Sequence, residues 1–250
     1  MASKLDQVLA GSLSDVGRIR DRNEDTCLVD ANRGLFIVSD GMGGAQAGEL
    51  ASEIVIRALP LMVEAHLAQC QQTPARLVRR SLRDIFTDLN QQMYNESLGR
   101  VGLRGMGATV VLVLIRKQWA HIAHMGDSRV YLWRSSGLEQ LTADHTLVGT
   151  LLRSGEITPR QAETHPARGH LTRFMGMGGE VYPDVKTIGL KKGDRLLLCS
   201  DGLTGMISDS EITTILATNE HPQRACEMLV TSANQAGGAD NITAVVVKWK

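Results

Sequence analysis

The chain has 250 residues, of which 43 % are hydrophobic and 22 % are charged, a balance typical of a globular protein with a sizeable core. Lysine plus arginine and aspartate plus glutamate number 27 each, so the charge gives no reason to expect nucleic acid or an anionic membrane as a partner. The longest apolar runs fall far short of the roughly 20 residues that a membrane-spanning helix needs, and no signal peptide is visible.

The first half of the chain predicts two short strands and two helices. The strands are expected at 28–29 and 35–39, and a helix at 48–67 contains Pro60, which removes one helical hydrogen bond. The clearest helix spans 74–98, because apolar residues recur there at intervals of three and four. Four arginines share another face of this helix and are interpreted as a solvated surface, with partner docking as the alternative: Arg76, Arg79, Arg80 and Arg83.

The second half contains more strands and a second pair of helices. Three consecutive strands are joined by short polar turns, which favour antiparallel pairing because a parallel crossover needs about a dozen residues; they lie at 109–115, 119–125 and 129–134. Residues 145–180 are less regular and contain one or two short helices. Further strands are expected at 182–188, 195–200 and 242–249, with helices near 209–217 and 222–235. Ser208 and Glu211 form the sequence signature of a capping box.

Strands that come in groups and helices that come in pairs predict an α+β fold with antiparallel sheets, rather than a parallel sheet. No segment is rich in proline, glycine and serine as a linker would be. We therefore expect residues 1–250 to form a single domain.

Acidic residues follow or precede several of these strands. "SDGMGG" at 39–44 is echoed by "SDGLTG" at 200–205, and each follows a buried-looking strand and precedes a helix. Asp-Gly is also a common hairpin turn pair, but Asp40 and Asp201 lead into helices and not into return strands. The turn interpretation is strongest for Asp127, which lies between adjacent strands. Asp240, in "GGADNIT", precedes the last strand.

A cluster of carboxylates from these motifs would repel one another unless a cation were shared. Because no cysteine or histidine accompanies the acids, oxygen ligands indicate Mg²⁺ or Mn²⁺. Two such ions about 3.5–4 Å apart are a standard device for attack on phosphorus. Glycine beside Asp40 would leave the backbone carbonyl of Gly41 accessible as a ligand.

Seven motifs in this order resemble those of the bacterial metal-dependent Ser/Thr protein phosphatases, the PPM or type 2C family: "RDRNED", "SDGMGG", "GATVV", "GDSRVY", "LTADHT", "SDGLTG" and "ADNIT". The resemblance extends from about residue 11 to the end of the chain. It implies a four-layer α-β-β-α sandwich, in which two central antiparallel sheets are flanked by helix pairs. It also implies that residues 145 to about 180 form a variable flap beside the active site.

The resemblance implies roles for individual residues. Asp40 would bridge two core ions, the Gly41 carbonyl would bind one of them, and Asp201 and Asp240 would complete the other site. Glu24 and Asp25 match the acidic pair that binds metal directly or through water, and Asp127 matches the acid that holds a third, weaker ion with Asp201. Arg20 matches the arginine that binds the phosphate.

The implied reaction is hydrolysis of phosphoserine or phosphothreonine in one step, by a hydroxide that bridges the two metals. One departure is that many relatives carry histidine where this chain has Met42 or Ala45. Our hypothesis is that a metal-bound water protonates the leaving oxygen instead. The expected partners are phosphorylated proteins, including a Ser/Thr kinase and its substrates, with the protein acting as a cytoplasmic monomer.

The same residues allow three alternative interpretations of the function. The glycines before the helix could hold a nucleotide phosphate in a binding module, but the dinucleotide and GK[ST] fingerprints are missing. An inactive phosphatase-like scaffold is disfavoured by the complete set of acids. Cys199 is a candidate nucleophile, but it lies in an apolar run without the Cys-x5-Arg loop, so a buried small hydrophobe is favoured. The four scattered cysteines otherwise fit a reducing compartment.

Overall fold

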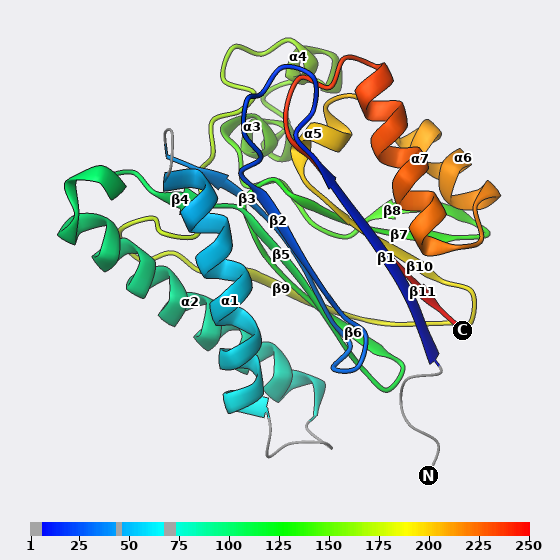
Figure 1. Ribbon diagram of the computed structural model, residues 1–250, viewed down its shortest axis with the longest axis horizontal. Helices are drawn as coiled ribbons and strands as arrows, with labels where there is room; N and C mark the ends of the chain where they lie inside the picture. The colour runs from blue at the N-terminus through cyan, green and yellow to red at the C-terminus, as the bar shows by residue number, and fades with distance from the viewer. Residues whose placement is uncertain (1–6, 44–46, 68–73) are drawn as a thin grey trace.

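Two antiparallel sheets form the centre of the computed structural model, which describes residues 7–43, 47–67 and 74–250 (Figure 1). Sheet A has the strand order β1-β11-β10-β7-β8, and sheet B has the order β2-β3-β5-β6-β9 with the short β4 beside β3. The paired neighbours run antiparallel. The predicted α+β class with antiparallel sheets is therefore confirmed.

The elements have the following bounds. Sheet A consists of β1 (Val8–Asp15), β7 (Arg129–Arg134), β8 (Gly137–Gln140), β10 (Arg195–Cys199) and β11 (Ile242–Trp249). Sheet B consists of β2 (Asp25–Asp30), β3 (Leu35–Met42), β4 (Gly107–Ala108), β5 (Val110–Arg116), β6 (Trp119–Met125) and β9 (Asp184–Gly189). The helices are α1 (Ala47–Leu67), α2 (Ala75–Gly99), α3 (Leu147–Ser154), α4 (Pro159–Glu163), α5 (Asp201–Thr204), α6 (Asp209–Thr218) and α7 (Pro222–Gln235).

The four layers follow from the two-residue period of the strands. In β3, Leu35 and Ile37 pack against α1 and α2, whereas Phe36 and Val38 point into the space between the sheets. In β11, Val245 and Val247 face the same space, and the alternate residues face α6 and α7. Strands that are apolar on both faces need a cover on each, which the two helix pairs provide.

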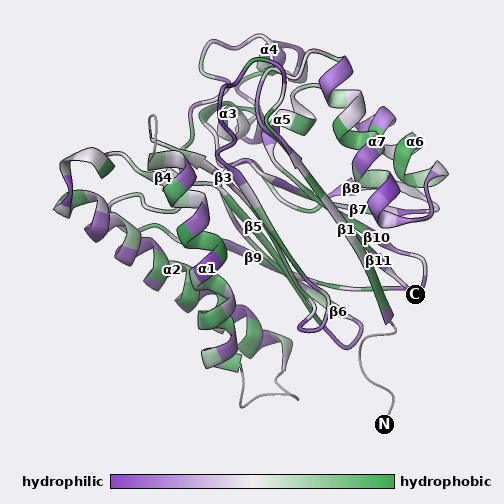
Figure 2. Cartoon of the chain, viewed as in Figure 1, coloured by the Kyte–Doolittle hydropathy of each residue, from purple (hydrophilic) through white to green (hydrophobic). Residues whose placement is uncertain are grey.

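The outer helices are amphipathic, as Figure 2 shows by the hydrophobic colouring on the sides of α1 and α2 that face the sheet. The predicted stripe of α2 is buried, and it consists of Val78, Leu82, Ile85, Phe86, Leu89 and Met93. The arginine face opposite is largely exposed, and Arg80 lies 3.8 Å from Asp84. No helix within the described ranges is both long and apolar enough to cross a lipid bilayer.

One predicted pairing is wrong. We expected the strands at 119–125 and 129–134 to pair, but β6 belongs to sheet B and β7 to sheet A. The chain crosses between the sheets at Gly126, whose φ of 109° suits a residue without a side chain. A short connection shows that two strands are close in space, but it does not decide whether they share a sheet. Strands β1 and β8 were not predicted, and Ala45 and Cys70 lie outside the described residues.

Candidate active site

Strand register brings the acids of sheet B together. Asp25 begins β2 and stands opposite Asp40 near the end of β3. Asp127 follows the end of β6, and Thr109, which precedes β5, donates its backbone N–H to the carbonyl of Asp40 at 2.8 Å. Because the strands are antiparallel, the start of β2, the end of β3, the start of β5 and the end of β6 lie at the same end of the sheet.

Sheet A contributes its acids at the same end of the sandwich. Cys199, the last residue of β10, pairs with both Ala244 of β11 and Arg129 of β7. Asp201 begins α5 just beyond this point, and Asp240 precedes β11. In Figure 1 this is the upper end, where α3, α4 and α5 lie.

Two polar side chains that sequence reasoning missed join the acidic segments of the two sheets. Ser200 donates its hydroxyl to Asp25 Oδ2 at 2.7 Å. Asn241 Oδ1 accepts the backbone N–H of Glu24 at 2.8 Å. Both residues are buried, and each directly adjoins a predicted site acid. The available signal was this adjacency, since a buried serine or asparagine beside an acid must find a hydrogen-bond partner.

A cleft of about 760 Å³ opens at this end of the molecule. Its lining includes most of the predicted site residues: Arg20, Glu24, Asp40, Gly41, Asp127, Asp201 and Asp240. Asp25 is not part of the lining and lies beneath the cleft, with 6 % of its surface exposed. Arg20 donates Nη2–H to Asp240 Oδ2 at 2.7 Å across the mouth. The described lining residues include no histidine.

The carboxyl groups in and beneath the cleft have raised pKa values, because burial and mutual repulsion disfavour their charged forms. Burial, with the charge of Asp201 as a further cause, raises the pKa of Asp25 to about 7 and that of Asp127 to about 7. Burial also raises the pKa of Asp40 well above its ordinary value, and the neighbouring carboxylates raise it further. The pKa of Asp201 is raised by burial first and by Asp240 second.

The donor set fits divalent cations. Asp25 Oδ1 is buried without a hydrogen-bond partner, an arrangement that costs free energy unless another group satisfies the oxygen. The clustered groups are carboxylates and a backbone carbonyl, which are the oxygen ligands that Mg²⁺ and Mn²⁺ prefer. A bound cation would also remove the repulsion that raises the pKa values of these acids.

Gly41 allows the backbone to come close to the site. A Cβ atom at this position would collide with the carbonyl of Gly48, at the start of α1. Gly41 also donates its N–H to the carbonyl of Glu24 at 3.2 Å. The glycine that the motif supplies is therefore required by close packing of three backbone segments.

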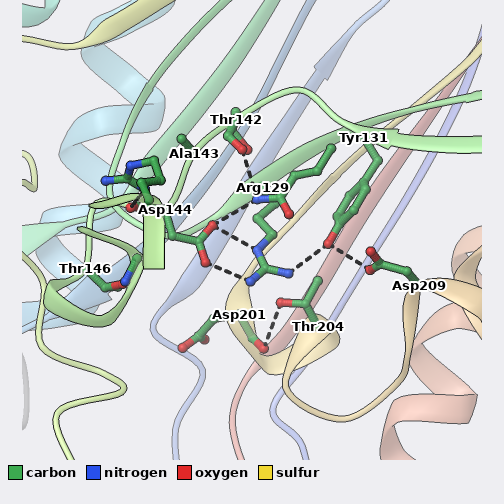
Figure 3. A network of polar contacts seen from close by, with 12 residues as sticks. Arg129, Tyr131, Thr142, Ala143, Asp144, Thr146, Asp201, Thr204 and Asp209 are labelled. Atoms are coloured by element: carbon green, nitrogen blue, oxygen red, sulfur yellow. Dashed lines mark hydrogen bonds and ion pairs between the residues drawn. The ribbon is translucent and has the colours of Figure 1, made fainter. Parts of the chain in front are cut away.

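Arg129 is a half-buried cation behind the acids and was not predicted. Figure 3 shows its guanidinium between Asp144 and Tyr131, near Asp201. Its Nε and Nη2 donate to Asp144 at 2.9 and 2.7 Å, and Nη1 donates to the hydroxyl of Tyr131 at 2.9 Å. The charge of Arg129 lowers the pKa values of Asp127 and Asp201, against the larger effect of burial.

A second cluster, of His124, His145 and Asp184, lies apart from the acids, and its ligand atoms are within 4.8 Å of one another. Its hydrogen bonds run from Gly126 through the ring of His145 to Asp184, an arrangement that leaves no free ligand atom on His145 for a metal. His145 Nδ1 accepts the N–H of Gly126 at 3.2 Å, so the proton of the neutral ring is on Nε2, which faces Asp184 at 3.2 Å. A metal at Nε2 would have to displace that proton.

Cys199 is fully buried, and burial raises the pKa of its thiol to about 12. A thiol with this pKa is almost entirely protonated at neutral pH. The favoured interpretation of Cys199 as a small hydrophobic residue agrees with this environment.

Comparison with known proteins identifies relatives over nearly the whole chain. The sequence profile of the protein phosphatase 2C family matches residues 19–244. The serine/threonine phosphatase stp of Listeria welshimeri is 39 % identical over 238 residues, covering 94 % of this chain and 93 % of the relative. The protein phosphatase PhpP of Streptococcus pneumoniae is 40 % identical over 239 residues, covering 94 % of this chain and 95 % of the relative.

Solved structures share the architecture. The serine/threonine phosphatase of S. agalactiae superposes with a TM-score of 0.89 at 32 % identity, covering 97 % of this chain and 100 % of the other. The catalytic domain of the phosphatase PstP, solved in complex with two manganese ions, superposes with a TM-score of 0.83 at 33 % identity, covering 97 % and 98 % of the two chains. The predicted α-β-β-α sandwich is confirmed by this likeness.

Proposed function

The chain belongs to the protein phosphatase 2C family and is a metal-dependent protein serine/threonine phosphatase, and from this premise we propose the role of each residue in the cleft. One observation carries the proposal. Carboxylates from distant parts of the chain meet in one cleft, where burial and mutual repulsion raise their pKa values. A protein gains little from such a cluster unless cations bind there.

In the proposed arrangement, Asp40 would be shared by two ions, and the carbonyl of Gly41 would be a ligand of one of them. Asp201 and Asp240 would bind the other. Glu24 and Asp25 would support the ions directly or through water, and Asp127 would hold a third, weaker ion together with Asp201. Bound divalent ions would supply a water of lowered pKa for direct attack on phosphorus and positive charge for the phosphoryl oxygens.

Arg20 is proposed to bind the phosphoryl group of the substrate. Its side chain is 53 % exposed at the mouth of the cleft, and one Nη2–H bond to Asp240 orients it. The remaining N–H groups of the planar fork can donate to two phosphoryl oxygens at once. This contact would hold the phosphorus in line for attack and stabilise the charge that develops on its oxygens.

The leaving serine or threonine oxygen needs a proton, and we propose that it comes from water in the cleft. Met42 lines the cleft in the motif where some relatives carry histidine, and the described lining includes no histidine. A pH–rate profile tests this. A protonation step near pH 6–7 that disappears with a single His→Ala substitution would contradict it.

The physiological substrates are proposed to be proteins phosphorylated by a partner Ser/Thr kinase. The names of the relatives, a serine/threonine phosphatase and a protein phosphatase, support the substrate class. We further propose that the chain acts as a cytoplasmic monomer, in one domain with residues 145–180 as a flap beside the cleft. Size-exclusion chromatography with light scattering tests the monomer.

The decisive experiment measures phosphate release from p-nitrophenyl phosphate and from a phosphothreonine peptide, with Mn²⁺ and with EDTA. Asp40→Asn and Asp201→Asn should each lower kcat/KM by at least about 100-fold, since they remove ligand charge. Asp88→Asn, which changes an exposed acid on α2, is the control and should leave the rate unchanged. Activity that resists EDTA, or that survives both site substitutions, would contradict the proposed roles.

Melting temperatures in EDTA separate a site effect from misfolding. Asp40→Asn removes an ionisable carboxyl whose charged form is disfavoured by burial and by its neighbours, so the metal-free variant should be at least as stable as the metal-free wild type. Its melting temperature should respond less to Mn²⁺.

A further inference from the structure

The cleft continues into a groove beneath α3. This groove has a volume of about 460 Å³ and shares Asp127, Gly169, Asp201 and Asp240 with the cleft. A polypeptide that presents a phosphorylated side chain to the acids must pass its neighbouring residues over the adjoining surface. The groove is therefore in reach of the residues that flank the phosphorylated position.

One wall of the groove is apolar. Val148 and Leu152 are four residues apart and lie on one face of α3. Met206, in the turn after α5, is a further apolar residue of the lining. Leu152 is 39 % exposed, so it offers uncovered apolar surface, whereas Val148 is 7 % exposed and forms the base of the wall.

Gly149 shapes the same face of α3. A Cβ atom at this position would lie 2.7 Å from the carbonyl oxygen of Asp144 and 3.0 Å from the hydroxyl of Thr146. Thr146 is the N-cap of α3 and accepts the N–H of Gly149 at 2.9 Å. The glycine therefore lets the helix start close to Asp144.

The floor of the groove contains an ion pair. Arg129 and Asp144 both line it, and they bind each other through two hydrogen bonds (Figure 3). A third N–H of Arg129 is directed to Tyr131. Glu163 and Arg168 also line the groove, and both are exposed. Beside Val148 and Leu152 the charges of Arg129 and Asp144 are bound to each other, so a neutral side chain would lose less hydration there than a charged one.

We propose that the groove receives an aliphatic side chain of the substrate protein, located within three residues of the phosphorylated serine or threonine. The inference rests on the proposed function of the adjoining cleft. The occupant is the substrate polypeptide because the groove is continuous with the site where its phosphate is bound. Leu152 is the residue that determines this preference, since its exposed side chain would be covered on binding.

The test uses phosphothreonine peptides in an alanine background, with leucine placed singly at each position from −3 to +3. In the full-length wild type with Mn²⁺, leucine at one of these positions should raise kcat/KM about tenfold over alanine. In Leu152→Ala this advantage should fall to about twofold or less. Hydrolysis of p-nitrophenyl phosphate, which has no flanking residues, should be the same in both proteins.

Leu147→Ala is the matched control. Leu147 lies on the same helix with the same exposure of 39 %, but it does not line the groove. This variant should keep the full leucine preference. A second variant, Leu152→Lys, should abolish the preference and improve peptides with glutamate at the same position, because it places a cation on the wall.

The outcomes are distinguishable. If no position prefers leucine, or if the preference survives both substitutions of Leu152, the groove proposal is wrong. If Leu147→Ala removes the preference as well, the effect belongs to α3 in general, and the assignment to the groove is also wrong. If the wild type fails to hydrolyse p-nitrophenyl phosphate with Mn²⁺, the proposed function of the cleft fails instead.

Discussion

At the scale of single residues, the site depends on backbone atoms that approach more closely than side chains allow. Gly41 follows Asp40 at the end of β3, and its Cα faces the carbonyl of Gly48. Its N–H is bound to the carbonyl of Glu24, so three acidic or glycine-rich segments meet at one point. The Asp-Gly pair of the motif thus combines a carboxylate with a position where a side chain would collide.

We expect Gly41→Ala to lower the free energy of unfolding by about 2–3 kcal/mol, because a methyl group would be forced into packed backbone. Urea denaturation in EDTA measures this without any contribution from metal. Gly99→Ala, at the end of α2, is the control, since a Cβ atom there meets nothing within 4 Å. Equal stability of the two variants would show that the backbone around Gly41 can adapt.

At the scale of elements, polar side chains hold the chain in place where helices α3 and α6 begin. Ser208 caps α6, and the reciprocal bonds with Glu211 complete the predicted capping box. Asp144 precedes α3 and is bound to Arg129 at the start of β7. The first contact is local and therefore predictable, but the second joins elements that only the fold brings together.

The capping box gives a local test. Ser208→Ala should lower the free energy of unfolding by about 1 kcal/mol, because the N–H of Glu211 loses its acceptor. Ser210→Ala, on the same exposed first turn, removes no such cap and should change stability by less than about 0.5 kcal/mol. Chemical denaturation of both variants makes the comparison, and equal losses would count against the cap.

The Arg129–Asp144 pair gives a non-local test. Its side chains are only 26 % and 19 % exposed, so Arg129→Met leaves a mostly buried carboxylate without its partner. We expect a loss of about 3 kcal/mol, and a smaller loss when Asp144→Leu is added, because the unpaired charge is then removed. A double mutant that is less stable than the sum of the single losses would contradict this view of the pair.

At the scale of the whole molecule, the acidic end of the sandwich joins the two sheets at an electrostatic cost. Asp25 and Asp40 belong to sheet B, whereas Asp201 and Asp240 flank strands of sheet A. Their repulsion opposes the docking of one sheet on the other, and ligands that bind only the folded chain offset it. Stability should therefore depend on both pH and metal.

The sign of the pH dependence follows from the raised pKa values. Burial raises the pKa of Asp25 and that of Asp127 to about 7, so between about pH 4 and pH 7 the folded chain binds more protons than the unfolded chain. The contribution of these groups to the free energy of unfolding in EDTA should fall as the pH rises through this range and then level off.

Thermal denaturation with and without Mn²⁺ measures the effect. The increase in melting temperature caused by Mn²⁺ should be larger near pH 7.5 than near pH 5.5, since protons compete with the ion for the carboxylates at the lower pH. An Asp25→Asn variant should show a weaker pH dependence in EDTA. A Mn²⁺ effect that is independent of pH would contradict the role given to these acids.

Periodicity and local motifs were sufficient for most elements. The stripe of α2, the strands at β5, β6 and β11, and the cap at Ser208 were predictable because each depends on residues close together in the sequence. Strands β1 and β8 were missed, and β1 alternates weakly, with Gly11 in its middle packed against the backbone of α7 at Gln223. The length of the turn between β6 and β7 could not predict that the two strands belong to different sheets.

The sequence by itself determined which acids stand at the ends of strands, that they are followed by glycines, and that oxygen ligands are available for hard cations. Only the tertiary structure decided that Asp25 is buried beneath the cleft, that Ser200 and Asn241 bind the two sheets together, and that Arg129 lies behind the acids. The physical reason is that burial, hydrogen-bond partners and pKa depend on distances between segments up to 220 residues apart in the sequence, such as those of Arg20 and Asp240. Local sequence patterns fix the direction of a side chain along its strand but not the neighbours it meets.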